Sequence, residues 1–116
     1  MGVVANAPAT LKAASVFIKM YAVIFKAEIN ELDQSYSETV VRMRELAISK
    51  YGCIEFTAVT EGKQEVAISY WSSEEQITAW REDPEHKVAQ ERGHFKWYKS
   101  YKVQIVKVVR EYGSNT

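Results

Sequence analysis

The spacing of hydrophobic residues changes several times along this chain of 116 residues, and the order of the changes constrains the fold. Phe17–Ile29 is rich in β-branched and aromatic residues that alternate between two faces, as in a strand. A set of residues at three- and four-residue steps follows, which is typical of one face of a helix: Tyr36, Val40, Met43, Ala47 and Tyr51. The chain therefore begins with a predicted strand and a predicted helix.

The ends of this helix and the next two strands are also marked. Ser35 and Glu38 stand three residues apart, the spacing of a capping box, so the helix is predicted to begin at Ser35. Gly52 is the residue type that most often ends a helix. Cys53–Val59 and Glu65–Trp71 then alternate as strands. The polar, glycine-containing link between them predicts an antiparallel hairpin.

Two helix starts and a last strand follow the hairpin. Ser73, with two glutamates after it, is expected to open a short helix. Asp83-Pro84 is a second start, because aspartate is a good N-cap and proline is favoured at the first helical position. This second helix is expected to run to about Gly93, and Val103–Val109 is predicted to be the closing strand.

The resulting order is β-α-β-β-α-β, which predicts an α+β, ferredoxin-like fold: a four-stranded antiparallel sheet with helices on one face. Residues 1–16 are interpreted as an N-terminal arm, 17–112 as the domain and 113–116 as a tail. The first and last strands carry apolar residues on both faces, although a sheet with one wet face should alternate cleanly. We therefore expect a homodimer that packs sheet against sheet. The alternative is that the alanine-rich arm covers this face.

Composition excludes several classes of function. Lys+Arg and Asp+Glu number 15 each, which argues against a nucleic-acid surface. No apolar run approaches the roughly 20 residues of a membrane-spanning helix, and no secretory signal is evident, so a cytoplasmic protein is expected. Cys53 is the single cysteine and cannot form an internal disulfide. His86 and His94 lack the spacing of a metal motif, so no metal site is predicted.

A series of aromatic and polar residues in the second half resembles a known family: Tyr70-Trp71, Trp80, Pro84-Glu85-His86, Ala89-Gln90 and Trp97-Tyr98. From about Met20 to Tyr112 the chain resembles the antibiotic biosynthesis monooxygenase superfamily of dimeric α+β barrels. Within it, the chain is most similar to the heme-degrading monooxygenase-like group. The superfamily includes cofactor-free oxygenases that form quinones, heme-degrading enzymes and members without an assigned activity.

The resemblance implies a heme triad only in part. Heme-degrading members use an asparagine in the first strand, a tryptophan after the third strand and a histidine ten residues later. Trp80 matches, but Gln90 stands at the histidine position. Phe25 and Lys26 occupy the region where the asparagine is expected. An amide does not replace imidazole as an iron ligand, so heme is disfavoured. His86 lies one turn before Gln90 and remains a possible iron ligand, which leaves heme degradation as a second alternative.

The leading hypothesis is a monooxygenase that uses O2 without a cofactor on a small phenol- or quinol-like aromatic. Such a site needs an aromatic pocket, a base and a hydrogen-bond donor for the developing anion. His86 is the candidate base, and Trp80 is a weaker catalytic candidate. Gln90 or Tyr98 is the candidate donor to the developing anion. The expected pocket residues are Phe25, Met43, Tyr70, Trp71, Gln90 and Trp97. The alternatives are simple packing of the aromatic residues and a dimeric small-ligand-binding domain without catalysis.

Overall fold

The computed structural model describes residues 19–114, and the predicted arm lies outside these residues. The elements, in chain order, are β1 Tyr21–Ile29, α3 Gln34–Ser49, β2 Glu55–Glu61, β3 Gln64–Trp71, α4 Glu74–Glu82, α5 Pro84–Arg92, a π-helical turn Gly93–Trp97 and β4 Tyr98–Lys107. This is the predicted α+β, ferredoxin-like order, with two short helices and a π-helical turn between β3 and β4.

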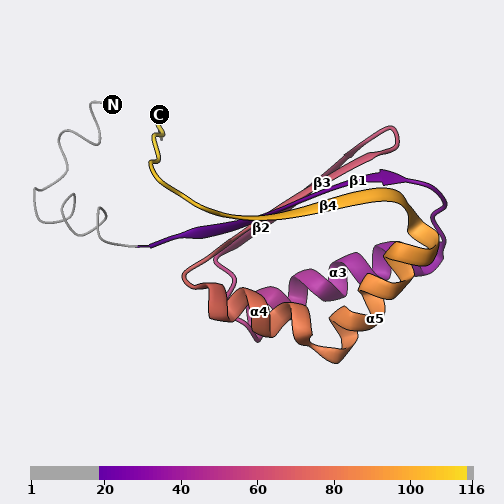
Figure 1. Ribbon diagram of the computed structural model, residues 1–116, viewed down its shortest axis with the longest axis horizontal. Coiled ribbons are helices and arrows are strands. Elements are labelled where there is room, and N and C mark those ends of the chain that lie inside the picture. The colour runs from indigo at the N-terminus through magenta and orange to yellow at the C-terminus, as the bar shows by residue number, and fades with distance from the viewer. Residues whose placement is uncertain (1–18, 115–116) are drawn as a thin grey trace, which may run out of the picture.

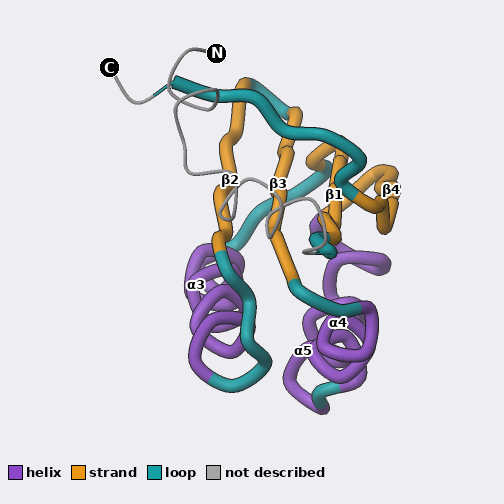
Figure 2. Tube along the Cα trace, turned by 90° about the vertical axis from the view of Figure 1, so that its left-hand side faces the viewer, coloured by secondary structure: helices purple, strands orange, loops and turns teal. Residues whose placement is uncertain are grey.

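The four strands form one antiparallel sheet in the order β2-β3-β1-β4. The three α-helices within residues 19–114 lie on one face of this sheet (Figure 1), and Figure 2 shows α3 beside the α4–α5 pair. The predicted antiparallel sheet with helices on one face is confirmed. No helix within residues 19–114 is long and apolar enough to cross a membrane.

The predicted start of α3 at Ser35 is wrong, and the helix begins at Gln34 after Asp33. The Ser35 hydroxyl donates to the Asp33 carboxylate at 2.7 Å, so it does not cap the backbone. The predicted stop is confirmed, because Gly52 has a φ of +82°, a conformation that glycine adopts easily. After this turn the Cys53 N–H donates to the Ala47 carbonyl at 2.9 Å.

Both predicted starts of the later helices are confirmed. The Ser73 hydroxyl accepts from the Gln76 N–H at 3.2 Å and begins α4. The Asp83 carboxylate accepts from the Glu85 N–H at 2.8 Å, and Pro84 takes the first position of α5. These local hydrogen bonds satisfy amide groups that a helix leaves free at its N-terminus.

The last strand begins earlier than predicted. Val103–Val109 was expected, whereas β4 covers Tyr98–Lys107 and pairs with β1 along its whole length. Its first half carries exposed polar residues, which an edge strand tolerates because only one of its sides is paired. The first half of β4 was therefore not predicted from the pattern of apolar residues. The π-helical turn before β4 was not predicted either.

The two faces of the sheet have different neighbours. On the face that meets the helices, Val23, Ser69 and Trp71 are at most 5% exposed and join a core that includes Ile77 and Trp80. The other face presents a row of apolar residues, which are half-buried or exposed apart from the buried Ala22: Ala22, Ile24, Val59, Val66, Ile68, Tyr70 and Val106. The expectation of apolar residues on both faces of the first and last strands is met in β1, whereas β4 presents Lys102 and Gln104 as well as Val106 on the free face.

Candidate functional site

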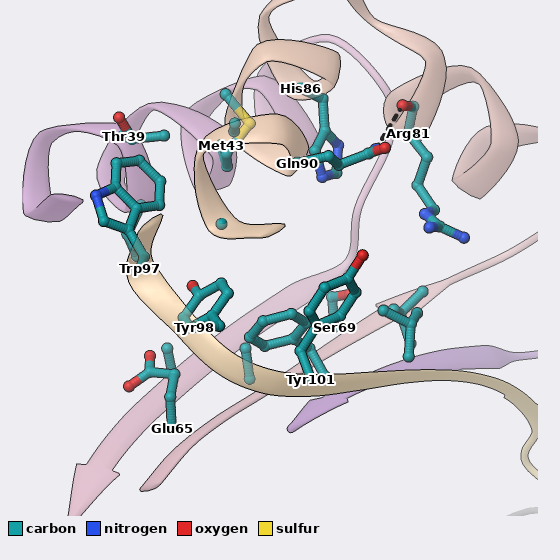
Figure 3. Close-up of a pocket in the computed structure, with 18 of the residues that line it drawn as sticks. Thr39, Met43, Glu65, Ser69, Arg81, His86, Gln90, Trp97, Tyr98 and Tyr101 are labelled. Carbon is teal, nitrogen blue, oxygen red and sulfur yellow. Dashed lines mark hydrogen bonds between the residues drawn. The ribbon is translucent and has the colours of Figure 1, made fainter. Parts of the chain in front are cut away.

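A cavity of about 160 Å³ lies between the sheet and the helices α3 and α5. Figure 3 shows side chains entering it from the helices above and from the strands below. Six of the residues predicted for the site line it together: Phe25, Met43, Trp80, His86, Gln90 and Trp97. The sheet, the helices α3, α4 and α5 and the π-helical turn thus bring these distant residues to one place.

Two residues predicted for the pocket wall do not line the cavity. Tyr70 lies on the opposite face of the sheet, because neighbouring residues of a strand point to opposite sides. Trp71 faces the helices but is fully buried in the core, where its indole N–H donates to the Ser69 hydroxyl at 2.8 Å. The cavity wall is formed instead by smaller residues of β3, including Ala67 and Ser69.

His86 stands at the start of α5 with one ring nitrogen bound and one free. Its Nδ1 lies 3.0 Å from the Trp80 carbonyl oxygen. A carbonyl only accepts hydrogen bonds, so Nδ1 carries the proton and Nε2 is left unprotonated in the neutral ring. Burial lowers the pKa of His86 to about 4. The ring is therefore neutral near pH 7.

The free nitrogen of His86 opens into the cavity. Nε2 has no hydrogen-bond partner among residues 19–114, yet every fully occluded side-chain nitrogen or oxygen there has one. Nε2 is therefore accessible, and the accessible space beside His86 is the cavity that it lines. An unprotonated imidazole nitrogen in this position can accept a proton or a hydrogen bond from a ligand.

Trp80 is part of the core and part of the cavity wall. Its ring centroid lies 5.2 Å from that of Trp71 and 4.2 Å from that of His86. Its indole N–H donates to the Met43 carbonyl at 3.1 Å, and the residue is 6% exposed. The N–H is thus already used, so Trp80 offers a ligand its ring rather than a hydrogen bond.

Gln90 and Arg81 lie beside His86 at the same end of the cavity. The Gln90 amide donates to the Arg81 carbonyl at 2.9 Å, which fixes the side chain (Figure 3). The Arg81 guanidinium forms no ion pair within the described part of the chain. Its charge, after burial, contributes to the low pKa of His86. An available cation therefore lines the same cavity as the candidate base.

The opposite end of the cavity holds polar groups that sequence reasoning missed or underrated. Glu65 of β3 is 5% exposed, and the Thr60 hydroxyl donates to one of its carboxylate oxygens. The Tyr98 hydroxyl donates to the Tyr36 hydroxyl at 3.1 Å. Burial raises the pKa of both tyrosines. A glutamate alternating with Ala67 and Ser69 on one strand face was the available signal for Glu65.

The residues present do not fit a heme. A cavity of about 160 Å³ is smaller than the roughly 300–1,000 Å³ of pockets for larger organic ligands. Gln90 stands where the resemblance places the iron ligand, and its amide nitrogen already donates to Arg81. His86 has a free nitrogen, but a porphyrin has no room beside it. No group of three or more metal-ligating side chains is found within residues 19–114.

Comparison with known proteins identifies the family. A family model described as antibiotic biosynthesis monooxygenase matches residues 20–92. A protein of Bacillus subtilis described as uncharacterized protein YqjZ is 40% identical over 92 residues, which is 78% of this chain and 81% of that protein. The chain therefore belongs to the antibiotic biosynthesis monooxygenase family. Membership of the heme-degrading-like group stays a prediction.

Solved structures share the fold. Rv0793 from Mycobacterium tuberculosis has a TM-score of 0.70 and 13% identity, over 81% of this chain and 99% of that one. SnoaB from Streptomyces nogalater, described as a cofactor-independent oxygenase, has a TM-score of 0.67 and 9% identity, over 79% and 95% of the two chains. At such low identity these similarities establish the fold alone.

Proposed function

We propose that this member of the antibiotic biosynthesis monooxygenase family oxidises a single-ring phenol with O2 and without a cofactor. The observation that carries the proposal is the unprotonated Nε2 of His86, which opens into an aromatic-lined cavity. The cavity of about 160 Å³ is close to the roughly 150 Å³ of an apolar cavity that binds benzene. One ring therefore matches the space.

In the proposed reaction the phenol hydroxyl gives its proton to Nε2 of His86. The Arg81 guanidinium stabilises the phenolate, whose ring carbon then carries negative charge and reduces O2. The carbon–oxygen bond that forms gives a hydroperoxide, which loses water to leave a quinone. The net change is phenol plus O2 to quinone plus water, so the substrate supplies all the electrons.

The low pKa of His86 sets a condition on this mechanism. A histidine with a pKa of about 4 is a weak base towards a phenol in the empty cavity. Proton transfer becomes favourable only with the phenolate held between the imidazolium and Arg81, because both positive charges then have a partner. Electron-rich phenols are the expected substrates, because their phenolates give up electrons to O2 more easily.

Oxygen consumption during a screen of single-ring phenols and hydroquinones tests this proposal. His86→Ala should lower turnover by roughly 10²-fold, the low end for a general base. His94→Ala is the matched control, because His94 is exposed and does not line the cavity. Unchanged turnover in His86→Ala would contradict the assignment. Ligand binding without any oxygen uptake would instead favour the alternative, a ligand-binding domain without catalysis.

We further propose that the chain forms a homodimer through the free face of its sheet. The apolar row on that face includes Val59, which is 60% exposed, and Val106, which is 37% exposed. Monomers seldom leave an apolar patch of this kind in water. Light scattering at micromolar concentration should give twice the 13.3 kDa of one chain, and Ile68→Glu should shift it to the monomer mass. A monomer mass for the unmodified protein would refute the dimer.

A further inference from the structure

Glu65 is a buried acid without a charged partner. It is 5% exposed, and its one hydrogen-bond partner within residues 19–114 is the Thr60 hydroxyl, which donates to Oε2. No ion pair in this part of the chain includes it. Oε1 has no hydrogen-bond partner within residues 19–114, and Glu65 lines the cavity.

Such a carboxylate is unusual in a protein interior. A buried charge is normally paired, because removing it from water is costly and only an opposite charge or several hydrogen bonds offset that cost. The single hydroxyl of Thr60 leaves Glu65 half satisfied. A positively charged group in the cavity would complete the arrangement.

Aromatic rings surround this end of the cavity. The Tyr36 ring lies 5.2 Å from that of Trp97 and 6.0 Å from that of Tyr98. Phe25 lies 5.2 Å from Tyr98 and 6.1 Å from Tyr101. Glu65 belongs to the same group, because Glu65 and Tyr101 are the two cross-strand neighbours of one β1 residue, Ala27. Figure 3 shows Glu65, Trp97 and Tyr98 on one side of the cavity and Tyr101 nearer its middle, beside Ser69. The Tyr101 ring lies 6.2 Å from that of Tyr98.

Ring faces and a carboxylate together have the chemistry of an ammonium site. The negative face of an aromatic ring attracts an organic cation, and several rings form a cage around it. The polar ends of two rings are already occupied, since the Trp97 N–H donates to Asp33 at 3.2 Å and the Tyr98 hydroxyl donates to Tyr36. These side chains therefore offer their rings to a ligand.

We propose that the Glu65 end of the cavity binds an organic ammonium group, with the carboxylate as its counter-ion. The inference rests on the proposed function for the other end of the ligand, where a phenol hydroxyl meets His86. Trp80, which His86 contacts, lies beside Phe56, and Phe56 pairs with Ser69. Ser69 therefore marks the His86 end of the cavity on β3, and Glu65 lies four residues, or about 13 Å, further along the same strand. A ligand that reaches both ends carries its hydroxyl and its ammonium group on opposite sides of the ring. The proposed ligand is thus a phenol with a short alkylammonium group opposite its hydroxyl.

Anaerobic calorimetric titration with three ring compounds of similar size tests the proposal. The compounds are para-(aminomethyl)phenol, the neutral para-cresol and the anionic para-hydroxybenzoate. The ammonium compound should bind about 10- to 100-fold more tightly than para-cresol, the range for a hydrogen bond to a charged group, and para-hydroxybenzoate should bind most weakly. Equal affinity for all three would overturn the proposal.

Variants locate the effect. Glu65→Gln should abolish the preference for the ammonium compound, whereas Glu61→Gln should keep it, because Glu61 is exposed on the other face of the sheet. Tyr101 is 47% exposed, so Tyr101→Ala tests the cage without a large loss of core. It should weaken the preference, and Tyr101→Phe should retain it. A preference that survives both Glu65→Gln and Tyr101→Ala would refute the site.

One further probe separates this site from the proposed reaction. Benzylammonium has no hydroxyl and cannot react by the phenol route, but its binding should still depend on Glu65. Binding of benzylammonium without oxygen uptake by any phenol would support the ammonium site and refute the proposed function. Oxygen uptake with phenols, together with equal affinity for compounds with and without the ammonium group, would support the proposed function and refute the ammonium site.

Discussion

The state of His86 predicts how the stability of the protein depends on pH. Burial lowers the pKa of this residue from 6.5 to about 4. Between these two values the unfolded chain binds a proton at His86 and the folded chain does not. The free energy of unfolding should therefore fall as pH falls from 6.5 to 4, by about 3 kcal/mol at the lower limit. Above pH 6.5 both states are neutral, and His86 adds no pH dependence.

Chemical denaturation at a series of pH values measures this slope, and His86→Gln isolates it. The variant lacks the titrating ring, so the difference between the two curves between pH 6.5 and 4 belongs to His86. Asp83 also has a lowered pKa, because the Tyr51 hydroxyl donates to it. Its effect on stability falls mainly below pH 3.8, whereas the pKa of Glu85, lowered from 4.5 by the hydrogen bond from Arg42, overlaps the lower end of the window. Both effects are present in the two proteins and cancel in the difference between their curves.

Nuclear magnetic resonance titration of the imidazole protons gives the pKa directly. A His94→Gln variant leaves one imidazole in the chain and so assigns the signal. A midpoint near 4 supports a buried neutral ring with a free Nε2. A midpoint near 6.5, together with an equal pH dependence of the unfolding free energy in the unmodified protein and in His86→Gln, would show that the ring is solvated. The assigned protonation state of His86 would then have no basis.

Three substitutions test the packing around the cavity. Trp80→Ala should cost about 3–5 kcal/mol of unfolding free energy, because the ring is core as well as wall, and a cost below 1 kcal/mol would contradict this. Gly93→Ala should destabilise the fold by about 1–3 kcal/mol, since its Cβ would lie 2.9 Å from the Tyr98 ring; a gain of about 1 kcal/mol from better helix propensity would mean that Tyr98 moves aside. Asp83→Ala should cost about 2 kcal/mol in thermal or chemical denaturation, through the lost cap of α5 and the lost bond to Tyr51, and an unchanged midpoint would refute that role.

The sequence predicted most reliably where a local hydrogen bond decides the structure. The caps at Ser73 and Asp83 were predicted because the capping side chain and the amide that it binds lie two or three residues apart. The start of α3 was wrong for a similarly local reason. Asp33 and Ser35 both suit a helix start, and the Ser35 hydroxyl binds Asp33 instead of the backbone.

Features set by distant neighbours could not be predicted in this way. The first half of β4 reads as a loop because Lys99, Ser100 and Lys102 are polar. It becomes a strand because β1 offers its free edge, with Lys102 opposite Lys26 and Tyr101 opposite Ala27. The π-helical turn before it depends on the same docking. The residues of β4 alone do not indicate that β1 will pair with them, so the strand could not be predicted from its own segment.

The misplacement of Tyr70 shows why the cavity was only partly predicted. Alternation indicates which residues of β3 share a face, but not which face meets the helices. Val66, Ile68 and Tyr70 are the more apolar set, yet they point away, and Glu65, Ala67 and Ser69 face the helices. Ala67 pairs across the sheet with Ala58, so two small side chains lie opposite the helices where large ones would fill the space. The cavity therefore follows from residues that a search for hydrophobic side chains passes over. The buried acid at its end was missed for the same reason, because Glu65 also breaks the apolar pattern expected of a residue that faces the core.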